Sequence, residues 1–485
     1  MSVLRAEPVP VVSRIAALDV IRGIALLGIL VVNMAFFGGP LGDALNPQHM
    51  AEESPPNQVA WAIETVFFQG KFISLFSLLF GAGLALQMAR ADAVASGARA
   101  TGIRARSTAA LILRRLGILA SVGLFHAGFI WYGDILFFYG VLGTLLIPAR
   151  HLSARVLRVL GLALAVLSVT CVGGFGAMQT WSAAMQRNAT PNAVVAAQPT
   201  TPATTEADAF LEPMERSADA APPSESDVEP SDTRRELPFR ALDLLVSSPE
   251  GPFGPEWAAM EREVYRDGPW IEVAALRVLS WAFILPVMIL VYSPHIVALF
   301  LLGMAASKLG WLKREAATVQ RRAALIGLSL GVSINALAAY IMWSSNFQQA
   351  NPAFALAAVL LELGSYVLAI GYAGLFARLA YSGSCATLFR LLANTGRMAF
   401  TVYLAQSVLM TGLMYHWGLG MFGAFERSEL LGIAVITWLA LVAFANVWLA
   451  MFRIGPLEWL WRMGTYLEVP PLLRRANRPA DARST

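Results

Sequence analysis

Residues 18–37 read LDVIRGIALLGILVVNMAFF, a stretch whose polar side chains are confined to Asp19, Arg22 and Asn33. Its length matches the ~20 residues that an α-helix needs to cross the hydrocarbon core of a bilayer. No small-x-small cleavage site follows at 36–40, so we expect a retained span rather than a signal peptide. This first apolar run predicts a helical membrane protein.

The composition of the whole chain indicates the same class. Of 485 residues, 57% are hydrophobic and 14% are charged, and the mean hydropathy is +0.58. These values exclude a soluble enzyme, a nucleic-acid-binding protein and a secreted disulfide scaffold. The net charge of +4 is read as membrane topology, with the lipid bilayer as the partner.

The apolar stretches predict an all-α fold, a polytopic transmembrane bundle of about ten spans. The predicted spans are 18–37, 67–88, 111–131, 135–148, 156–178, one crossing within 270–311, 323–343, 354–376, 398–419 and 430–451.

Charge sets the predicted orientation. The segment 43–64 carries acidic residues and no Lys or Arg, whereas the loop after 67–88 is rich in arginine. The positive-inside rule then places both termini in the cytoplasm. Only an odd number of crossings fits within 270–311, so we expect 271–291, which contains Arg277 and Pro286, to lie at the interface or re-enter.

One long stretch is not apolar. Residues 188–237 are rich in Ala, Pro, Thr, Ser, Asp and Glu, which predicts a disordered extracytoplasmic loop. The expected domains are an N-terminal transmembrane bundle of five spans (1–180), a largely disordered extracytoplasmic loop (181–269), a C-terminal transmembrane domain (270–465) and a cytoplasmic tail (466–485).

Polar side chains inside spans are costly, on the order of 3 kcal/mol at the helix centre, and mark interior surfaces. Asp19 and Arg22 are three residues apart on one helix face at the cytoplasmic end of the first span, and Asn33 is near its outer end. They form either an anchoring ion pair with an outer polar cap, or a site where Arg22 binds a cytoplasmic anion such as a phosphate. Lys71, near the outer end of the second span, either snorkels to the headgroups or faces the interior.

His126 and Asp134 lie at the same predicted depth on either side of a short connection. A carboxylate beside a histidine fixes its tautomer and raises its basicity, so the pair is a candidate general base. Tyr139 is a candidate third member of the pocket. The alternative is a histidine that only serves packing.

Other chemistry lacks a motif. The chain has no phosphate-cradling loop, no His-Glu-x-x-His and no Cys/His cluster with metal-ligand spacing, so neither ATP hydrolysis nor a metal site is predicted. Gly81-Ala82-Gly83 is attributed to close helix packing. Cys171 and Cys385 are expected near opposite membrane faces and therefore unbonded.

Several motifs resemble the YeiB-like family of bacterial inner-membrane proteins, defined by a domain of unknown function numbered 418. The motifs are Leu18-Asp19-Val20-Ile21-Arg22-Gly23 through Val32-Asn33, Gly70-Lys71-Phe72 through Gly83, His126 with Trp131, Gly133 and Asp134, Gly396-Arg397-Met398 through Tyr403 and Gln406, and 452–462. Val402 stands where the family has Asn, so a polar role is not carried over to that position.

The opening motif is also similar to that of membrane acetyltransferases that act on heparan glucosamine, and more loosely to bacterial acyltransferases of envelope sugars. The resemblance implies that cytoplasmic acyl-CoA donates an acyl group to an extracytoplasmic small-molecule or glycan acceptor, with no covalently bound cofactor. It adds Trp131, Arg397, Tyr403 and Gln406 to the binding residues. In the heparan enzymes the reactive histidine lies between the first two spans, where this chain has His49, a weaker match than His126.

Two hypotheses follow. In the first, Arg22 and Arg397 bind the phosphates of the donor, and His126 with Asp134 deprotonates the acceptor. In the second, a permease or exporter of a small polar solute lines its path with Asp19, Arg22, Lys71, His126 and Asp134. A third reading is a scaffold whose polar groups only pair with one another. All mechanistic readings assume that these side chains converge on one site; the sequence does not indicate the oligomeric state.

Overall fold

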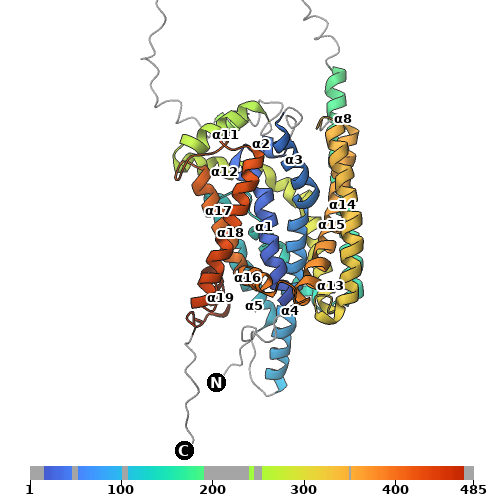
Figure 1. Ribbon diagram of the computed structural model, residues 1–485, viewed down its shortest axis with the longest axis vertical. Coiled ribbons are helices and arrows are strands. Elements are labelled where there is room, and N and C mark those ends of the chain that lie inside the picture. The colour runs from blue at the N-terminus through green and yellow to red at the C-terminus, as the bar shows by residue number, and fades with distance from the viewer. Residues whose placement is uncertain are drawn as a thin grey trace, which may run out of the picture.

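The computed structural model describes residues 16–45, 53–100, 107–189, 240–244, 254–348 and 351–474. Within these ranges the chain is a helical bundle without a β-strand, and an isolated bridge pairs Phe452 with Leu473 (Figure 1). The predicted all-α class is thus confirmed. His49 and most of the predicted loop 188–237 lie outside the described residues.

The helices follow one another along the chain with short connections. They are α1 (Ala16–Gly38), α2 (Leu41–Leu45), α3 (Pro55–Ile63), α4 (Lys71–Ala100), α5 (Thr108–Phe129), α6 (Leu136–Gly143), α7 (Leu146–Ala149), α8 (Ala154–Ala189), α11 (Pro255–Asp267), α12 (Trp270–Val287), α13 (Ser293–Lys308), α14 (Ala317–Ser344), α15 (Pro352–Tyr381), α16 (Ala386–Arg397), α17 (Ala399–Met414), α18 (Arg427–Met451) and α19 (Pro456–Tyr466).

Eight helices are long and apolar enough to cross a membrane. They span 17–38, 55–97, 108–129, 154–182, 270–308, 314–344, 352–381 and 427–451. The other two predicted spans are shorter: 135–148 is divided between α6 and α7, and 398–419 contains α17 with its 16 residues. Their short helices are tolerated at membrane depth because neighbouring helices bury them.

The structure corrects the prediction for 271–291. That segment neither lies apart nor re-enters, because α12, a π-helical turn at Met288–Tyr292 and α13 form one helical segment from Trp270 to Lys308. Both apolar segments thus belong to the same crossing. The π-helical turn accommodates the two prolines, and Ser293 Oγ donates to the free carbonyl of Met288 at 3.1 Å.

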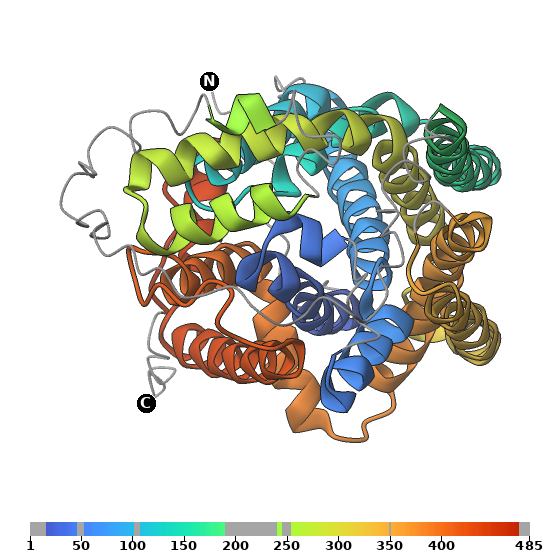
Figure 2. The same ribbon diagram turned by 90° about the horizontal axis from the view of Figure 1, so that it is seen from above.

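The first helix is central to the bundle. Figure 2 shows α1 near the middle of the molecule, where α4, α15, α16, α17 and α18 surround it. Two glycines permit the closest approach: Gly23 of α1 lies against the backbone of Leu392, and Gly396 of α16 lies against the carbonyl of Asp19. The opening motif is therefore buried against the Gly-Arg-Met motif.

The bundle has two distinct ends, which we call the α19 end and the α11 end (Figure 1). At the α19 end, α19 contacts the start of α5 through a hydrogen bond from Trp461 Nε1 to Arg115 O at 3.0 Å. At the α11 end, Glu261 of α11 accepts from Leu41 N of α2 at 2.8 Å. The helix α11 and the end of α8 lie within the predicted loop 181–269, so that region contains ordered helix as well.

Candidate functional site

The predicted pair of His126 and Asp134 is in contact. His126 lies in the last turn of α5 and Asp134 just before α6. His126 Nδ1 and Asp134 Oδ2 are 2.9 Å apart, and both side chains are fully buried. Asp134 Oδ1 also accepts from Phe137 N at 2.7 Å. Because an ionised carboxylate can only accept hydrogen bonds, Nδ1 carries the proton between the two side chains.

The other ring nitrogen is the chemically available atom. His126 Nε2 is buried and has no hydrogen-bond partner among the described residues. With the proton on Nδ1, Nε2 presents a lone pair, as a general base requires. The rings of Tyr403 and Trp131 lie 5.6 and 6.4 Å from the imidazole, centroid to centroid. Two residues indicated by the family resemblance thus surround the histidine.

Other predicted residues lie near this pair without joining it. Tyr139 directs its hydroxyl to Ser77 Oγ at 2.6 Å, and no hydrogen bond links it to His126 in the described chain. Gln406 Nε2 donates to Leu26 O at 3.0 Å and ties α17 to α1. Asn33 is half-buried on α1, and Val402 is fully buried, in agreement with an apolar role.

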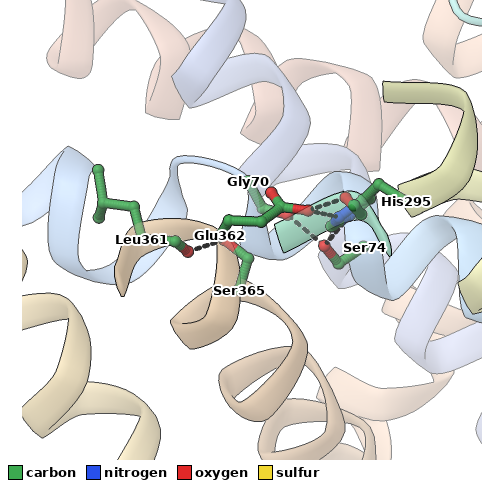
Figure 3. A network of polar contacts seen from close by, with 7 residues as sticks. Gly70, Ser74, His295, Leu361, Glu362 and Ser365 are labelled. Atoms are coloured by element: carbon green, nitrogen blue, oxygen red, sulfur yellow. Dashed lines mark hydrogen bonds and ion pairs between the residues drawn. The ribbon is translucent and has the colours of Figure 1, made fainter. Parts of the chain in front are cut away.

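A second polar network connects four helices (Figure 3). His295 of α13 places Nδ1 at 2.6 Å from Glu362 Oε1 of α15 and Nε2 at 2.8 Å from Ser74 Oγ of α4. Ser168 of α8 donates to the same Glu362 oxygen. The Ser74 hydroxyl is also within reach of Gly70 O, so its proton has two alternative acceptors. The chain Ser74–His295–Glu362 can therefore relay a proton within the bundle.

Lys71 belongs to this second network. Its side chain is fully buried and does not snorkel; Nζ donates to Thr65 O at 2.6 Å. Its nearest opposite charge is Glu362, whose carboxylate it attracts. The sequence analysis missed Glu362 and treated His295 as isolated. An acidic residue in the middle of the apolar stretch 352–381 was the signal that was available.

The expected single site is thus resolved into two networks. Within the described residues, no hydrogen bond or ion pair joins Lys71 to His126. The two networks are adjacent along α4, because Tyr139, next to the His126 pair, bonds Ser77 one turn after Ser74. The assumption that all polar groups converge on one site is wrong for Lys71 and correct for His126 and Asp134.

The predicted cytoplasmic ion pair forms at the α19 end. Arg22 Nη1 lies 3.4 Å from Asp19 Oδ1. Arg115 stacks over Trp461, with 3.5 Å between the guanidinium carbon and the ring centroid. Arg22 and Arg462 are near enough to Arg115 to repel it. Three guanidinium groups therefore gather around the start of α5, a charge pattern that suits a polyanion.

Arg397 is held by its surroundings. Its Nη1 donates to Asn394 Oδ1 at 3.1 Å, and its Nη2 donates to Arg453 O at 3.2 Å. These bonds connect the end of α16 with the segment before α19. Arg397 thus lies at the α19 end, as predicted, but its described contacts are structural.

Glu458 explains why the C-terminal motif has an acidic residue. Its carboxylate accepts from Phe400 N at 2.7 Å, from Thr401 N at 3.1 Å and from Thr401 Oγ1 at 2.6 Å, so it caps the start of α17. Burial raises the pKa of Glu458 above its usual value, against these hydrogen bonds that lower it. This cap fixes α17, which carries Tyr403 beside His126.

The fold and the buried polar networks define a class: an integral membrane protein built as an α-helical bundle. In the described residues no group of three or more His, Cys, Asp or Glu is arranged to hold a metal ion.

Comparison with known proteins gives the family. Residues 306–468 match the family described as Protein of unknown function (DUF418). The chain is 29% identical over 466 residues to Uncharacterized protein YeiB of Escherichia coli (strain K12), covering 96% of this chain and 100% of that protein. It is 26% identical over 493 residues to Uncharacterized protein YxaH of Bacillus subtilis (strain 168), covering 97% and 99%. No solved structure matches. The chain is a YeiB-like protein with a DUF418 domain, and this prediction is confirmed.

Proposed function

We propose that the protein is a transmembrane acyltransferase that moves an acyl group from cytoplasmic acyl-CoA to an extracytoplasmic acceptor. The observation that supports this proposal is the buried His126–Asp134 pair, whose Nε2 has no hydrogen-bond partner in the described chain. A histidine that only served packing would have both ring nitrogens bonded. This one is oriented at Nδ1 and available at Nε2.

The charge distribution supports a donor site at the α19 end. Arg22 and the neighbouring Arg115 and Arg462 offer forked donors for the phosphates of acyl-CoA. Arg115 and His126 lie on the same helix, eleven residues apart, or about 16 Å along its axis. An extended pantetheine arm can bridge that separation, so the phosphates and the thioester can occupy the two sites together.

The reaction needs one base and one leaving group. His126 Nε2 takes the proton from the acceptor hydroxyl or amine, and the resulting oxygen or nitrogen nucleophile forms a bond to the acyl carbonyl carbon. The carbon–sulfur bond of the thioester breaks, and the thiolate of coenzyme A receives the proton from Nε2. Asp134 stabilises the imidazolium in between.

The same proposal fixes location and orientation. The arginine-rich α19 end faces the cytoplasm of a bacterial inner membrane, and the α11 end faces outward, so both termini are cytoplasmic. Acyl-CoA is a cytoplasmic metabolite, which agrees with a donor site at that end.

The test uses the full chain in nanodiscs. We expect acyl-CoA to protect the protein from thermal unfolding, Arg22→Ala to weaken this protection, and His126→Gln to preserve it while abolishing thioester turnover. His151→Gln, in an exposed turn, is the matched control. If acyl-CoA neither binds nor protects, the transferase proposal is wrong.

The second network favours an alternative, a permease or exporter of a small polar solute. Lys71, His295 and Glu362 are ionisable groups inside the bundle, and such groups often mark ion or solute paths. Proteoliposomes with an imposed pH gradient test this: labelled amino acids and sugars should accumulate with the native chain and with His126→Gln, and not with Glu362→Gln. That pattern would select transport over acyl transfer.

A further inference from the structure

Arg277 is a buried cation without a counter-ion. It lies on α12 toward the α11 end, and its exposed fraction is 0%. Nη1 donates to Phe129 O at 2.6 Å, and the Tyr265 hydroxyl lies beside the guanidinium. Nε and Nη2 are buried without a hydrogen bond of ordinary geometry, and no carboxylate pairs with Arg277 in the part of the chain that the structure describes.

Aromatic rings form the walls around this guanidinium. Its central carbon lies 4.8 Å from the ring centroid of Trp417 and 5.3 Å from that of Tyr415. Tyr415 stacks in turn on Tyr265, with 4.5 Å between centroids. Cation–π contacts compensate only part of the cost of burying a charge, so the site lacks an anion.

Further donors around Arg277 have no acceptor. Ser280, one turn along the same face of α12, and the hydroxyl of Tyr415 are buried and unpartnered among the described residues. The indole N–H of Trp131 is in the same condition. Three helical elements thus supply unsatisfied donors, which a ligand rich in acceptor oxygens would satisfy.

The site adjoins the proposed base. Phe129, whose carbonyl binds Arg277, is three residues after His126 on α5. Trp131 contributes its N–H to the donor set and its ring to the surroundings of His126. A ligand bound at Arg277 therefore places its neighbouring atoms close to His126 Nε2.

We propose that Arg277, together with Tyr415, Ser280 and Trp131, binds an anionic group, a carboxylate or a phosphate, and that the acceptor of the acyl group is an anionic molecule rather than a neutral sugar. The role as acceptor rests on the proposed acyl transfer. The anion site itself does not.

Two sources of this anion are chemically equivalent: a soluble acid and the headgroup of an anionic lipid. The experiment separates them. Full-length protein in phosphatidylcholine nanodiscs is titrated with inorganic phosphate, D-glucuronate and the neutral D-glucose, and binding is followed by calorimetry. A second set of nanodiscs contains phosphatidylglycerol, and its effect on the melting temperature is measured.

We expect saturable binding of glucuronate or phosphate, no binding of glucose, and at least a ten-fold loss of affinity in Arg277→Gln. Arg277→Lys should keep part of the affinity because it keeps the charge. Arg262→Gln is the matched control, an exposed arginine on α11 paired with Asp43 at 2.8 Å. If phosphatidylglycerol stabilises the native chain but not Arg277→Gln, and soluble anions do not bind, the anion is a lipid headgroup.

Equal binding of glucose and glucuronate, or anion effects that are identical in native and Arg277→Gln protein, would overturn the inference. Should Arg277→Gln fail to fold, Tyr415→Phe and Ser280→Ala provide the same comparison. Acyl-CoA protection is measured on the same samples. Loss of anion binding with intact acyl-CoA protection counts against this site alone, whereas the reverse counts against the transferase.

Discussion

At the residue scale, the chemistry depends on which nitrogen of His126 carries a proton. The Asp134 carboxylate is held by Phe137 N and approaches Nδ1, so the lone pair is directed away from Asp134 at Nε2. The family resemblance drew attention to both residues. Their contact, their complete burial and the unpartnered Nε2 come from the way in which α5 and α6 fold back on each other.

Asp134→Asn should therefore impair turnover without unfolding the protein. The amide of asparagine can donate to Nδ1 and leave the proton on Nε2, the wrong tautomer for a base. We expect acyl transfer to fall by about 10²- to 10⁴-fold. The measurement is thioester turnover in nanodiscs, with the melting temperature as the check on folding. Asp92→Asn, at an exposed ion pair with Arg150, is the control. Normal turnover in Asp134→Asn would refute this role.

Glu261 makes stability depend on pH. Its side chain is fully buried in α11, and this burial raises the pKa of the carboxyl from 4.5 to about 8. The folded state thus keeps a proton that the unfolded chain loses between these two values. The free energy of unfolding should fall as pH rises through this window, by up to about 1.4 kcal/mol per pH unit, and level off above it.

Melting temperatures from pH 4.5 to 9 check this expectation. Glu261→Gln resembles the protonated acid, so its melting temperature should decline less than that of the native chain. Glu263→Gln, an exposed neighbour on the same helix, should follow the native curve. A decline that is the same in Glu261→Gln and native protein would assign the pH dependence to other groups.

At the element scale, glycines determine how closely the helices pack. Gly81 of α4 lies against the backbone of Phe300, and Gly303 of α13 lies against the backbone of Leu78. The two helices therefore meet at their backbones, and this close crossing brings Ser74 within hydrogen-bond distance of His295. The sequence analysis attributed Gly81-Ala82-Gly83 to helix packing, and the contact of Gly81 confirms it.

Gly81→Ala should destabilise the protein by about 1–3 kcal/mol, because the added methyl group would overlap a carbonyl that cannot move without its helix. Gly117→Ala, on α5 where no atom lies within 4 Å of the added methyl, should be neutral or stabilising by up to about 1 kcal/mol. Melting temperatures in nanodiscs compare the two. If both variants melt alike, the crossing is less tight than described.

At the scale of the whole molecule, charge differs between the two ends. Arginines from α1, α5, α16 and α19 gather at the α19 end. At the α11 end, carboxylates are frequent and two of them cap or bond neighbouring segments, Glu261 with Leu41 N and Glu426 with Asn57. This asymmetry is the physical basis for the proposed orientation.

The two native cysteines allow a direct test of orientation. Cys385 is exposed at the start of α16, next to the α19 end, and both cysteines are free. In a Cys171→Ala background, an impermeant maleimide should label Cys385 only after the cells are permeabilised. Leu419→Cys, in a cysteine-free background, should be labelled in intact cells, since Leu419 is 71% exposed near α11. The opposite pattern would invert the topology.

Period and composition alone determined much of this protein. Runs of apolar residues near the bilayer-spanning length set the number and type of elements, because lipid admits only segments that satisfy their own backbone groups. Individual motifs led to His126, Asp134, Arg22 and the family. For 271–291 the same reasoning failed, since Arg277 and Pro286 argued against a crossing while α12 and α13 in fact join across a π-helical turn.

Only the tertiary structure decided which polar residues meet. Ser74, Ser168, His295 and Glu362 are separated by up to 288 positions, and hydrophobic periodicity carries no information about which helix neighbours which. Helix adjacency depends on close crossings such as Gly23 with Leu392 and Gly81 with Phe300, where backbone shapes must fit. Membrane residence is therefore encoded locally in the sequence, whereas the partners of each buried charge arise from packing.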